Sequence, residues 1–238
     1  MAEQRTFRAL GGVDEGTLPP AGEVADALRA EFDRVTRPAP LELPAYGAER
    51  HRVLLYDFGA KASIAARLRG LGARVRVVPA ATPAADAFAW SPDGVVLSNG
   101  PGDPATVACG VQAARELLGR VPLLGICLGH QLLGRAAGGR TVRLKFGHRG
   151  VNQPVVELAT GRVAVTSHNH GFAVDAASLP AGVEVTHVNA NDGVVEGLAC
   201  REVPAFSVQY HPEAAPGPHD AHPLFERFAA LMEGARHG

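Results

Sequence analysis

The chain has 238 residues, of which 46% are hydrophobic and 20% are charged. This composition is typical of a folded domain with a sizeable core and excludes an intrinsically disordered chain. The formal net charge of −1 argues against nucleic acid or an anionic membrane as the main partner. Three widely spaced cysteines fit a reducing compartment, and the first residues form no apolar signal segment. We therefore expect a cytoplasmic protein.

Residues 1–51 differ from the rest because Gly and Pro interrupt them repeatedly. Apolar residues at helical spacing between positions 24 and 35 predict one short helix. A single helix of this size cannot form a core of its own. We expect 1–51 to be an N-terminal arm or linker, or the remnant of a lost domain, beside a main domain formed by 52–238.

From residue 52 onward, short apolar strands alternate with helical stretches. The strands are expected at 52–56, 74–78, 95–97 and 121–126, and the helices at 63–70, 107–118 and 131–137. Such alternation indicates the α/β class, with a mostly parallel central sheet covered by helices on both faces.

After residue 139 the pattern becomes β-rich. Short strands are expected at 141–144, 154–158, 162–166, 183–188, 194–200 and 205–210, followed by an amphipathic helix at 224–232. We expect these strands to form a β-rich portion that flanks the parallel sheet as meanders.

The most informative stretch is Gly-Ile-Cys-Leu-Gly at 125–129, between an apolar strand and a helix-capable segment. Gly-x-nucleophile-x-Gly in this setting is a nucleophile elbow, in which glycines allow the backbone to pass close to a strained turn. The helix N-terminus would favour the thiolate of Cys127, and the backbone N–H of Leu128 would donate to an oxyanion. Alone, the pattern also fits a cysteine that merely fills the core.

A cysteine nucleophile needs a base, and the base needs a group that fixes its tautomer. The strand at 205–210 ends in His211-Pro212-Glu213. The carboxyl ends of parallel strands meet at one rim, so His211 is expected beside Cys127, with Glu213 returning to its ring.

The Gly- and Pro-rich loop at 98–104 also follows a strand and should reach the same rim. It is either an ordinary turn or a loop whose backbone approaches a ligand closely, and it lacks the Lys-Ser/Thr of a P-loop. His168 and His170 alternate along a strand and could share a face, but no third ligand follows at a useful spacing. We therefore expect no metal site, and we expect Asn169 to contact a polar ligand.

Several segments together resemble one family, the small subunits of carbamoyl-phosphate synthase, whose glutaminase part is a class I glutamine amidotransferase domain. The similar segments are 56–61, 97–104, 125–131, 145–148, 169–174 and 211–214 with 216–220. The resemblance covers residues 52–238. Residues 1–51 do not match the larger N-terminal domain of that family, most of which we expect this chain to lack.

The resemblance implies a catalytic triad in which Cys127 is the nucleophile, His211 the acid and base, and Glu213 the residue that orients it. The implied glutamine contacts are Gly100, Gly102, Leu128, Gln131, Asn169, Gly171 and Phe172.

The resemblance also implies the reaction and its partners. Ammonia is released from glutamine through a Cys thioester, and a large subunit combines it with bicarbonate and ATP. The product, carbamoyl phosphate, serves arginine and pyrimidine biosynthesis. This chain then needs no cofactor of its own, with ATP and Mg expected on the large subunit. Its partners are L-glutamine and that subunit, with no nucleic acid and no membrane.

Two alternatives stay open. The first is a stand-alone γ-glutamyl cysteine hydrolase, or another class I amidotransferase, which would turn over without a synthetase. The second is an inactive glutamine-binding remnant. The intact Cys127, His211 and Glu213 argue against the second.

Overall fold

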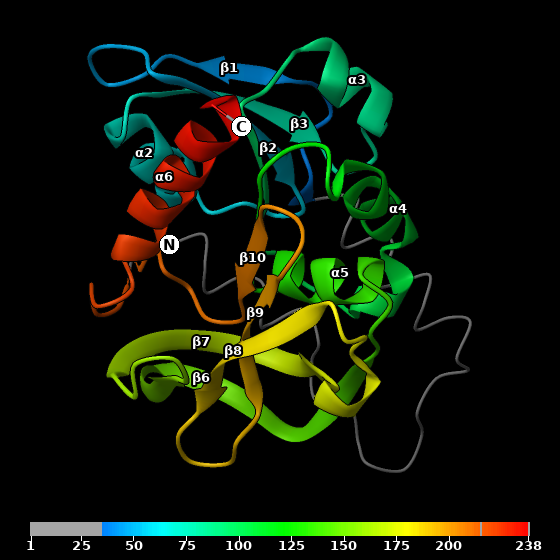
Figure 1. The fold of residues 1–238 in the computed structure, drawn as a ribbon, viewed down its shortest axis with the longest axis vertical. Helices are drawn as coiled ribbons and strands as arrows, with labels where there is room; N and C mark the ends of the chain where they lie inside the picture. The colour runs from blue at the N-terminus through cyan, green and yellow to red at the C-terminus, as the bar shows by residue number, and fades with distance from the viewer. Residues whose placement is uncertain (1–34, 215, 238) are drawn as a thin grey trace.

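The computed structural model describes residues 35–214 and 216–237, and these form one ten-stranded sheet with helices on both faces (Figure 1). The strand order is β1-β3-β2-β4-β5-β10-β9-β8-β6-β7. The strands are β1 (Leu41–Leu43), β2 (His51–Asp57), β3 (Ala73–Pro79), β4 (Gly94–Leu97), β5 (Leu123–Ile126), β6 (Thr141–Glu157), β7 (Val163–Val174), β8 (Val183–Asn189), β9 (Val195–Cys200) and β10 (Ala205–Val208). The α-helices are α2 (Ala62–Gly70), α3 (Ala84–Ala89), α4 (Ala108–Leu117), α5 (Leu128–Ala136) and α6 (Pro223–His237).

One half of the sheet is parallel, as the alternating pattern predicts. Strands β3, β2, β4, β5 and β10 pair in parallel in that order. Alternate residues of β2 serve opposite faces: Val53 and Leu55 pack in the core cluster with α2 and α6, whereas Leu54 and Tyr56 pack in the cluster with α3, α4 and α5. Figure 1 shows these two helical layers on either side of the sheet. The α/β class is confirmed.

The β-rich portion continues the same sheet and does not merely flank it. From β10, the antiparallel strands β9, β8, β6 and β7 extend it in that order. The segments expected at 141–144 and 154–158 belong to one long strand, β6, whose pairing with β7 shifts register twice. Gly147 and Gly150 lie between those segments with φ of 67° and 125°, so the backbone can bend there without ending the strand.

Two short elements escaped the sequence analysis. Strand β1 pairs antiparallel with β3 at the sheet edge. It lies between Pro40 and Pro44, and prolines usually indicate the absence of a strand, although an edge strand tolerates them. Helix α3 is six residues long, too short for an apolar period. The helix expected between 24 and 35 falls outside the described residues except for Val35.

The last residues before β1 are held against the sheet as well. The hydroxyl of Thr36 donates to the carbonyl of Asp57 at 2.6 Å, and the N–H of Arg37 donates to the Asp57 carboxylate at 3.1 Å. Residues 36–43 therefore pack on the parallel half.

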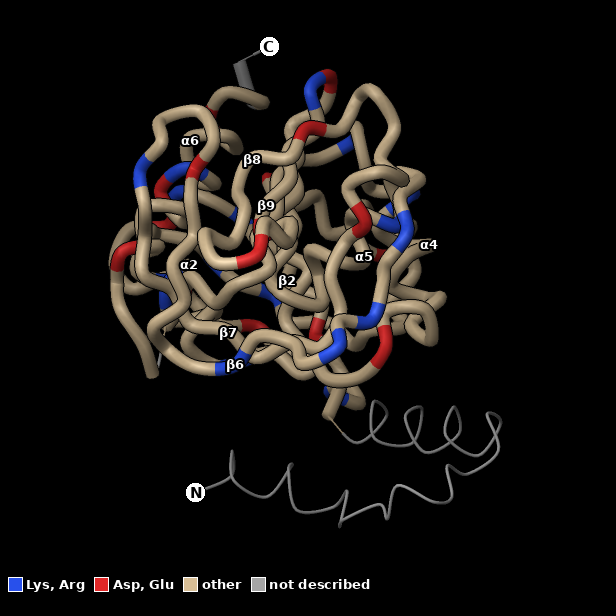
Figure 2. Tube along the Cα trace, turned by 90° about the horizontal axis from the view of Figure 1, so that it is seen from below, with Lys and Arg blue, Asp and Glu red and all other residues tan. Residues whose placement is uncertain are grey.

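Figure 2 shows Lys and Arg residues interspersed with Asp and Glu residues along the described part of the chain. None of the helices within residues 35–214 and 216–237 is both long and apolar enough to cross a membrane.

Candidate active site

Cys127 sits at the turn between β5 and α5. Its φ of 54° and ψ of −102° are unusual for a residue with a side chain, and they identify a strained backbone. The helix begins at Leu128, directly after the cysteine and three residues before the predicted start. The sulfur therefore lies at the N-terminus of α5, where the helix dipole and the free N–H groups favour negative charge.

The two glycines of the motif are required by close packing. A Cβ on Gly125 would lie 2.6 Å from the carbonyl oxygen of Gly129, and a Cβ on Gly129 would lie 2.0 Å from the carbonyl oxygen of Leu97. The N–H of Gly129 also donates to the carbonyl of Ser98 at 3.0 Å. This packing places the first turn of α5 directly on the end of β4.

His211 and Glu213 lie on the same rim as Cys127. The N–H of Cys127 donates to the carbonyl of Val208, the last residue of β10, at 2.9 Å. The Nδ1 of His211, three residues further on, donates to Oε1 of Glu213 at 2.7 Å, and both side chains are buried. Because a carboxylate only accepts, Nδ1 carries a proton and Nε2 is the nitrogen left for the sulfur.

The electrostatics of this pair favour a charged imidazole. Burial alone lowers the pKa of His211, but the charges of Cys127 and Glu213 and hydrogen bonds to both raise it, to about 10. A protonated imidazole beside a deprotonated sulfur is the form in which a cysteine nucleophile attacks.

Two further residues contact the triad, and the sequence analysis gave neither a role. The Nζ of Lys61 lies 3.6 Å from Oε1 of Glu213, the oxygen that accepts from His211. The fully buried Gln209 points its Nε2 at the Cys127 sulfur, 3.7 Å away. Lys61 belongs to the segment 56–61 that resembles the family. Its contact with Glu213 could not be predicted, because Glu213 follows β10 and is distant in the sequence.

Four of the expected glutamine contacts are joined by packing or hydrogen bonds. A Cβ on Gly100 would lie 2.8 Å from Cδ2 of Leu128, so the loop after β4 touches the start of α5. The Nε2 of Gln131 donates to the carbonyl of Phe172 at 2.8 Å and to Oε1 of Gln209 at 2.9 Å. The amide of Gln131 thus ties α5 to β7 and to the residue beside the sulfur.

The remaining three expected contacts neighbour these groups in the chain. Gly102 has a φ of 94° and follows Gly100 in the loop. Asn169 is exposed on β7, and a Cβ on Gly171 would meet no atom within 4 Å. Strand β7 reaches the triad, since the N–H of His211 donates to the carbonyl of Ser167 at 2.9 Å. The expected contacts therefore lie on the loop after β4, the start of α5 and strand β7, and β7 contacts both His211 and Gln131.

Comparison with known proteins shows which family the sequence matches. Residues 54–231 match the family model "Glutamine amidotransferase class-I". The chain is similar to the carbamoyl phosphate synthase small chain of Syntrophotalea carbinolica, with 57% identity over 190 residues that cover 80% of this chain and 50% of the relative. It is also similar to the chloroplastic small chain of Arabidopsis thaliana, with 49% identity over 90% of this chain and 48% of the relative. The chain thus spans about half the length of these curated relatives.

A solved structure shares the fold. The crystal structure of a putative GMP synthase subunit from Thermoplasma acidophilum matches with a TM-score of 0.67 and 21% identity, over 78% of this chain and 96% of that protein. This likeness concerns the fold alone. The match to the family model, which spans three quarters of the sequence, shows the family of the chain. The chain belongs to the class I glutamine amidotransferase family.

Proposed function

We propose that the chain is the glutamine-hydrolysing subunit of a carbamoyl-phosphate synthase, with residues 52–238 as its amidotransferase domain and the preceding residues as an N-terminal arm. The observation that carries the proposal is Cys127 at a strained elbow, with the His211–Glu213 pair on the same rim. The similarity to carbamoyl phosphate synthase small chains selects the kind of synthase.

The first chemical step is attack of the Cys127 thiolate on the side-chain amide carbon of glutamine. The carbonyl oxygen becomes an oxyanion, and the backbone N–H groups of Leu128 and the Gly100 loop donate to it. The imidazolium of His211 gives its Nε2 proton to the amide nitrogen, the C–N bond breaks, and ammonia leaves. A γ-glutamyl thioester on Cys127 remains.

The second step is hydrolysis of that thioester. His211, now neutral, takes a proton from water, and the resulting hydroxide attacks the thioester carbon. Collapse of the intermediate expels the thiolate and releases glutamate. Glu213 keeps Nδ1 protonated throughout, so the same nitrogen, Nε2, gives and takes the proton.

The side chain of glutamine would be held by Gly100, Gly102, Leu128, Gln131, Asn169, Gly171 and Phe172. Glutamine hydrolysis here uses side chains, backbone and water, while the ATP and Mg required to make carbamoyl phosphate belong to the large subunit. Cys127 and Cys200 are free thiols, which suits a reducing compartment, so we place the reaction in the cytoplasm.

Incubation of the purified chain with glutamine, alone and with a synthetase large subunit, tests the proposal. We expect slow glutamate release alone, faster release with the large subunit, and carbamoyl phosphate when bicarbonate and MgATP are added. Rapid turnover that the large subunit does not change would favour the stand-alone hydrolase. No glutamate under either condition would rule out the proposed function.

A further inference from the structure

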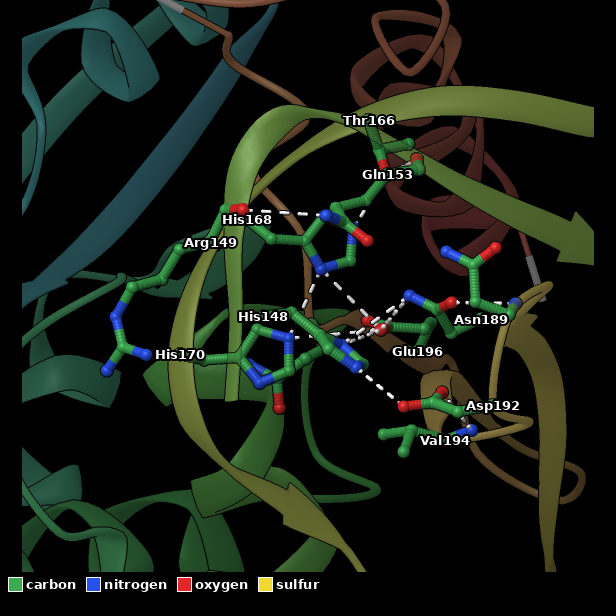
Figure 3. Close-up of polar contacts among 12 residues, drawn as sticks. His148, Arg149, Gln153, Thr166, His168, His170, Asn189, Asp192, Val194 and Glu196 are labelled. Carbon is green, nitrogen blue, oxygen red and sulfur yellow. Dashed lines mark hydrogen bonds and ion pairs between the residues drawn. The ribbon is translucent and has the colours of Figure 1, made fainter. Parts of the chain in front are cut away.

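A second cluster of reactive side chains lies next to the proposed active site. His148 on β6, His168 and His170 on β7, and Glu196 on β9 each offer one ligand atom, and these atoms lie within 4.8 Å of one another. Figure 3 shows the three imidazole rings turned toward the Glu196 carboxylate. The sequence offers no third ligand at a useful spacing from His168 and His170, but the sheet brings His148 and Glu196 beside them from strands that are distant in the sequence.

The cluster is buried. The side chains of His168 and Glu196 are 0% exposed, that of His170 is 2% exposed, and that of His148 is 12% exposed. A carboxylate with this burial requires compensation by partners or by a cation. Yet Oε2 of Glu196 is a buried atom with no hydrogen-bond partner among the described residues.

The outer nitrogens of two rings fix their tautomers. The hydroxyl of Thr166 donates to the carbonyl of Gln153 at 2.9 Å, so it accepts from Nε2 of His168, 2.7 Å away. Nδ1 of His170 donates to the carbonyl of Phe172 at 2.9 Å. In the neutral rings, the bare nitrogens are then Nδ1 of His168 and Nε2 of His170.

These two bare nitrogens face each other at 3.2 Å. Two lone pairs at this separation repel unless a proton or a metal ion lies between them. This geometry points to a positive ligand.

His148 and Glu196 complete the set. Nε2 of His148 contacts Oδ2 of Asp192 at 2.8 Å, which leaves its Nδ1 directed at Oε1 of Glu196, 3.0 Å away. The same Oε1 lies 3.5 Å from Nδ1 of His168 and 3.8 Å from Nε2 of His170. Each imidazole thus has an oxygen partner on its outer nitrogen, the arrangement that orients metal-binding histidines.

The separations suit a small divalent ion. Zinc bonds of about 2.0–2.1 Å in a tetrahedron place ligand atoms about 3.4 Å apart. Four of the six separations among the inner atoms are 3.0, 3.2, 3.5 and 3.8 Å, and these bracket that value. Three imidazoles and one carboxylate match zinc chemistry better than the all-oxygen sites of calcium or magnesium.

We propose that His148, His168, His170 and Glu196 bind one Zn²⁺ in a closed, four-ligand structural site. The ion would cross-link β6, β7 and β9 in the antiparallel half of the sheet. It would also fix the carbonyl of Phe172, which accepts from both His170 and Gln131. The zinc would thus support the segment of β7 that contacts Gln131, without touching the reacting atoms.

Metal analysis of the full chain tests the proposal without relying on glutamine hydrolysis. The untagged protein is purified with ZnSO₄, dialysed against a weak chelator, and its zinc content is measured by mass spectrometry. We compare the wild type with His168→Gln, Glu196→Gln and a matched control, His187→Gln, which alters a buried histidine on β8 outside the cluster. Replacement by Co²⁺ then reports the ligand geometry through its visible absorption.

We expect about one zinc per chain in the wild type and in His187→Gln, with at least a tenfold lower content in the two ligand variants. The Co²⁺ form of the wild type should show the intense absorption of a four-coordinate site. A wild type that retains no zinc would overturn the proposal, even if a ligand variant fails to fold. Equal retention in His168→Gln, Glu196→Gln and the wild type would overturn it as well.

Discussion

Glu213 acts on the proposed reaction through His211, so its effect should be visible in the pH dependence. The imidazolium is the acid that protonates departing ammonia, and its pKa of about 10 places loss of activity above that pH. In Glu213→Gln one of the charges that raises this pKa is gone, so the alkaline limb of the kcat profile should move to lower pH. We also expect kcat to fall by about 10²- to 10⁴-fold, the range for general acid–base catalysis.

The pH–rate profile of glutamate release measures both effects. Lys61→Met serves as the comparison, because it removes a neighbour of Glu213 but leaves the carboxylate that accepts from His211. An alkaline limb in Glu213→Gln that coincides with that of the wild type would contradict this role for Glu213.

His130 should make the fold sensitive to acid. It is fully buried, its Nδ1 contacts the Ser207 hydroxyl at 2.9 Å, and burial lowers its pKa to about 3. Between pH 6.5 and pH 3 the unfolded chain therefore binds a proton at this ring that the folded chain does not. The neutral His130 ring makes its full contribution to the free energy of unfolding above pH 6.5. This contribution decreases as the pH falls, by about 1.4 kcal/mol at pH 5.5.

Denaturant unfolding at pH 7.5 and pH 5.5 checks this prediction. His130→Asn should lose about 1.4 kcal/mol less than the wild type between the two pH values. Ser207→Ala should lose stability at both pH values but keep the wild-type difference, because the buried ring stays. The same pH difference in His130→Asn and the wild type would refute the prediction.

At the scale of elements, the close approach of α5 to β4 sets the position of Cys127. In Gly129→Ala the new Cβ would lie 2.0 Å from the Leu97 carbonyl oxygen, so the helix or strand must move. We expect a loss of about 1–3 kcal/mol in the free energy of unfolding, the usual cost of overpacking, together with loss of glutamate release.

Gly182→Ala is the matched control, since its Cβ would meet no atom within 4 Å and its φ is not in the left-handed region. Chemical denaturation and glutamate release are measured for both variants. Wild-type stability and activity in Gly129→Ala would show that the elbow does not need this contact.

The sequence predicted the parallel strands well because each is a short apolar run that ends at a turn. The elements β2, β3, β4 and β5 lie within a residue or two of the expected ranges. It predicted β6 as two strands, because nothing local shows that Gly147 and Gly150 bend a strand and do not end it. It missed β1, because β1 is flanked by Pro40 and Pro44 and pairs with β3, which is distant in the sequence.

At the scale of the whole molecule, one sheet carries two different environments. The parallel half supplies Cys127 and the antiparallel half supplies the histidine and carboxylate cluster, and β10 joins them at the triad. The proximity of Cys127, His211 and Glu213 could be predicted because all three residues lie in local motifs at strand ends. Strand order could not be predicted from the sequence. It determines the contacts of Lys61 and Gln209 and brings His148 and Glu196 into one cluster.

The proposed reaction requires that Cys127 form a γ-glutamyl thioester with glutamine. The most direct measurement is acid quenching of the chain during turnover of radiolabelled glutamine, followed by peptide mapping, in the wild type and in Cys127→Ala. We predict label on the peptide that contains Cys127 in the wild type, and neither label nor glutamate release in Cys127→Ala. Glutamate release by Cys127→Ala at the wild-type rate would contradict the account.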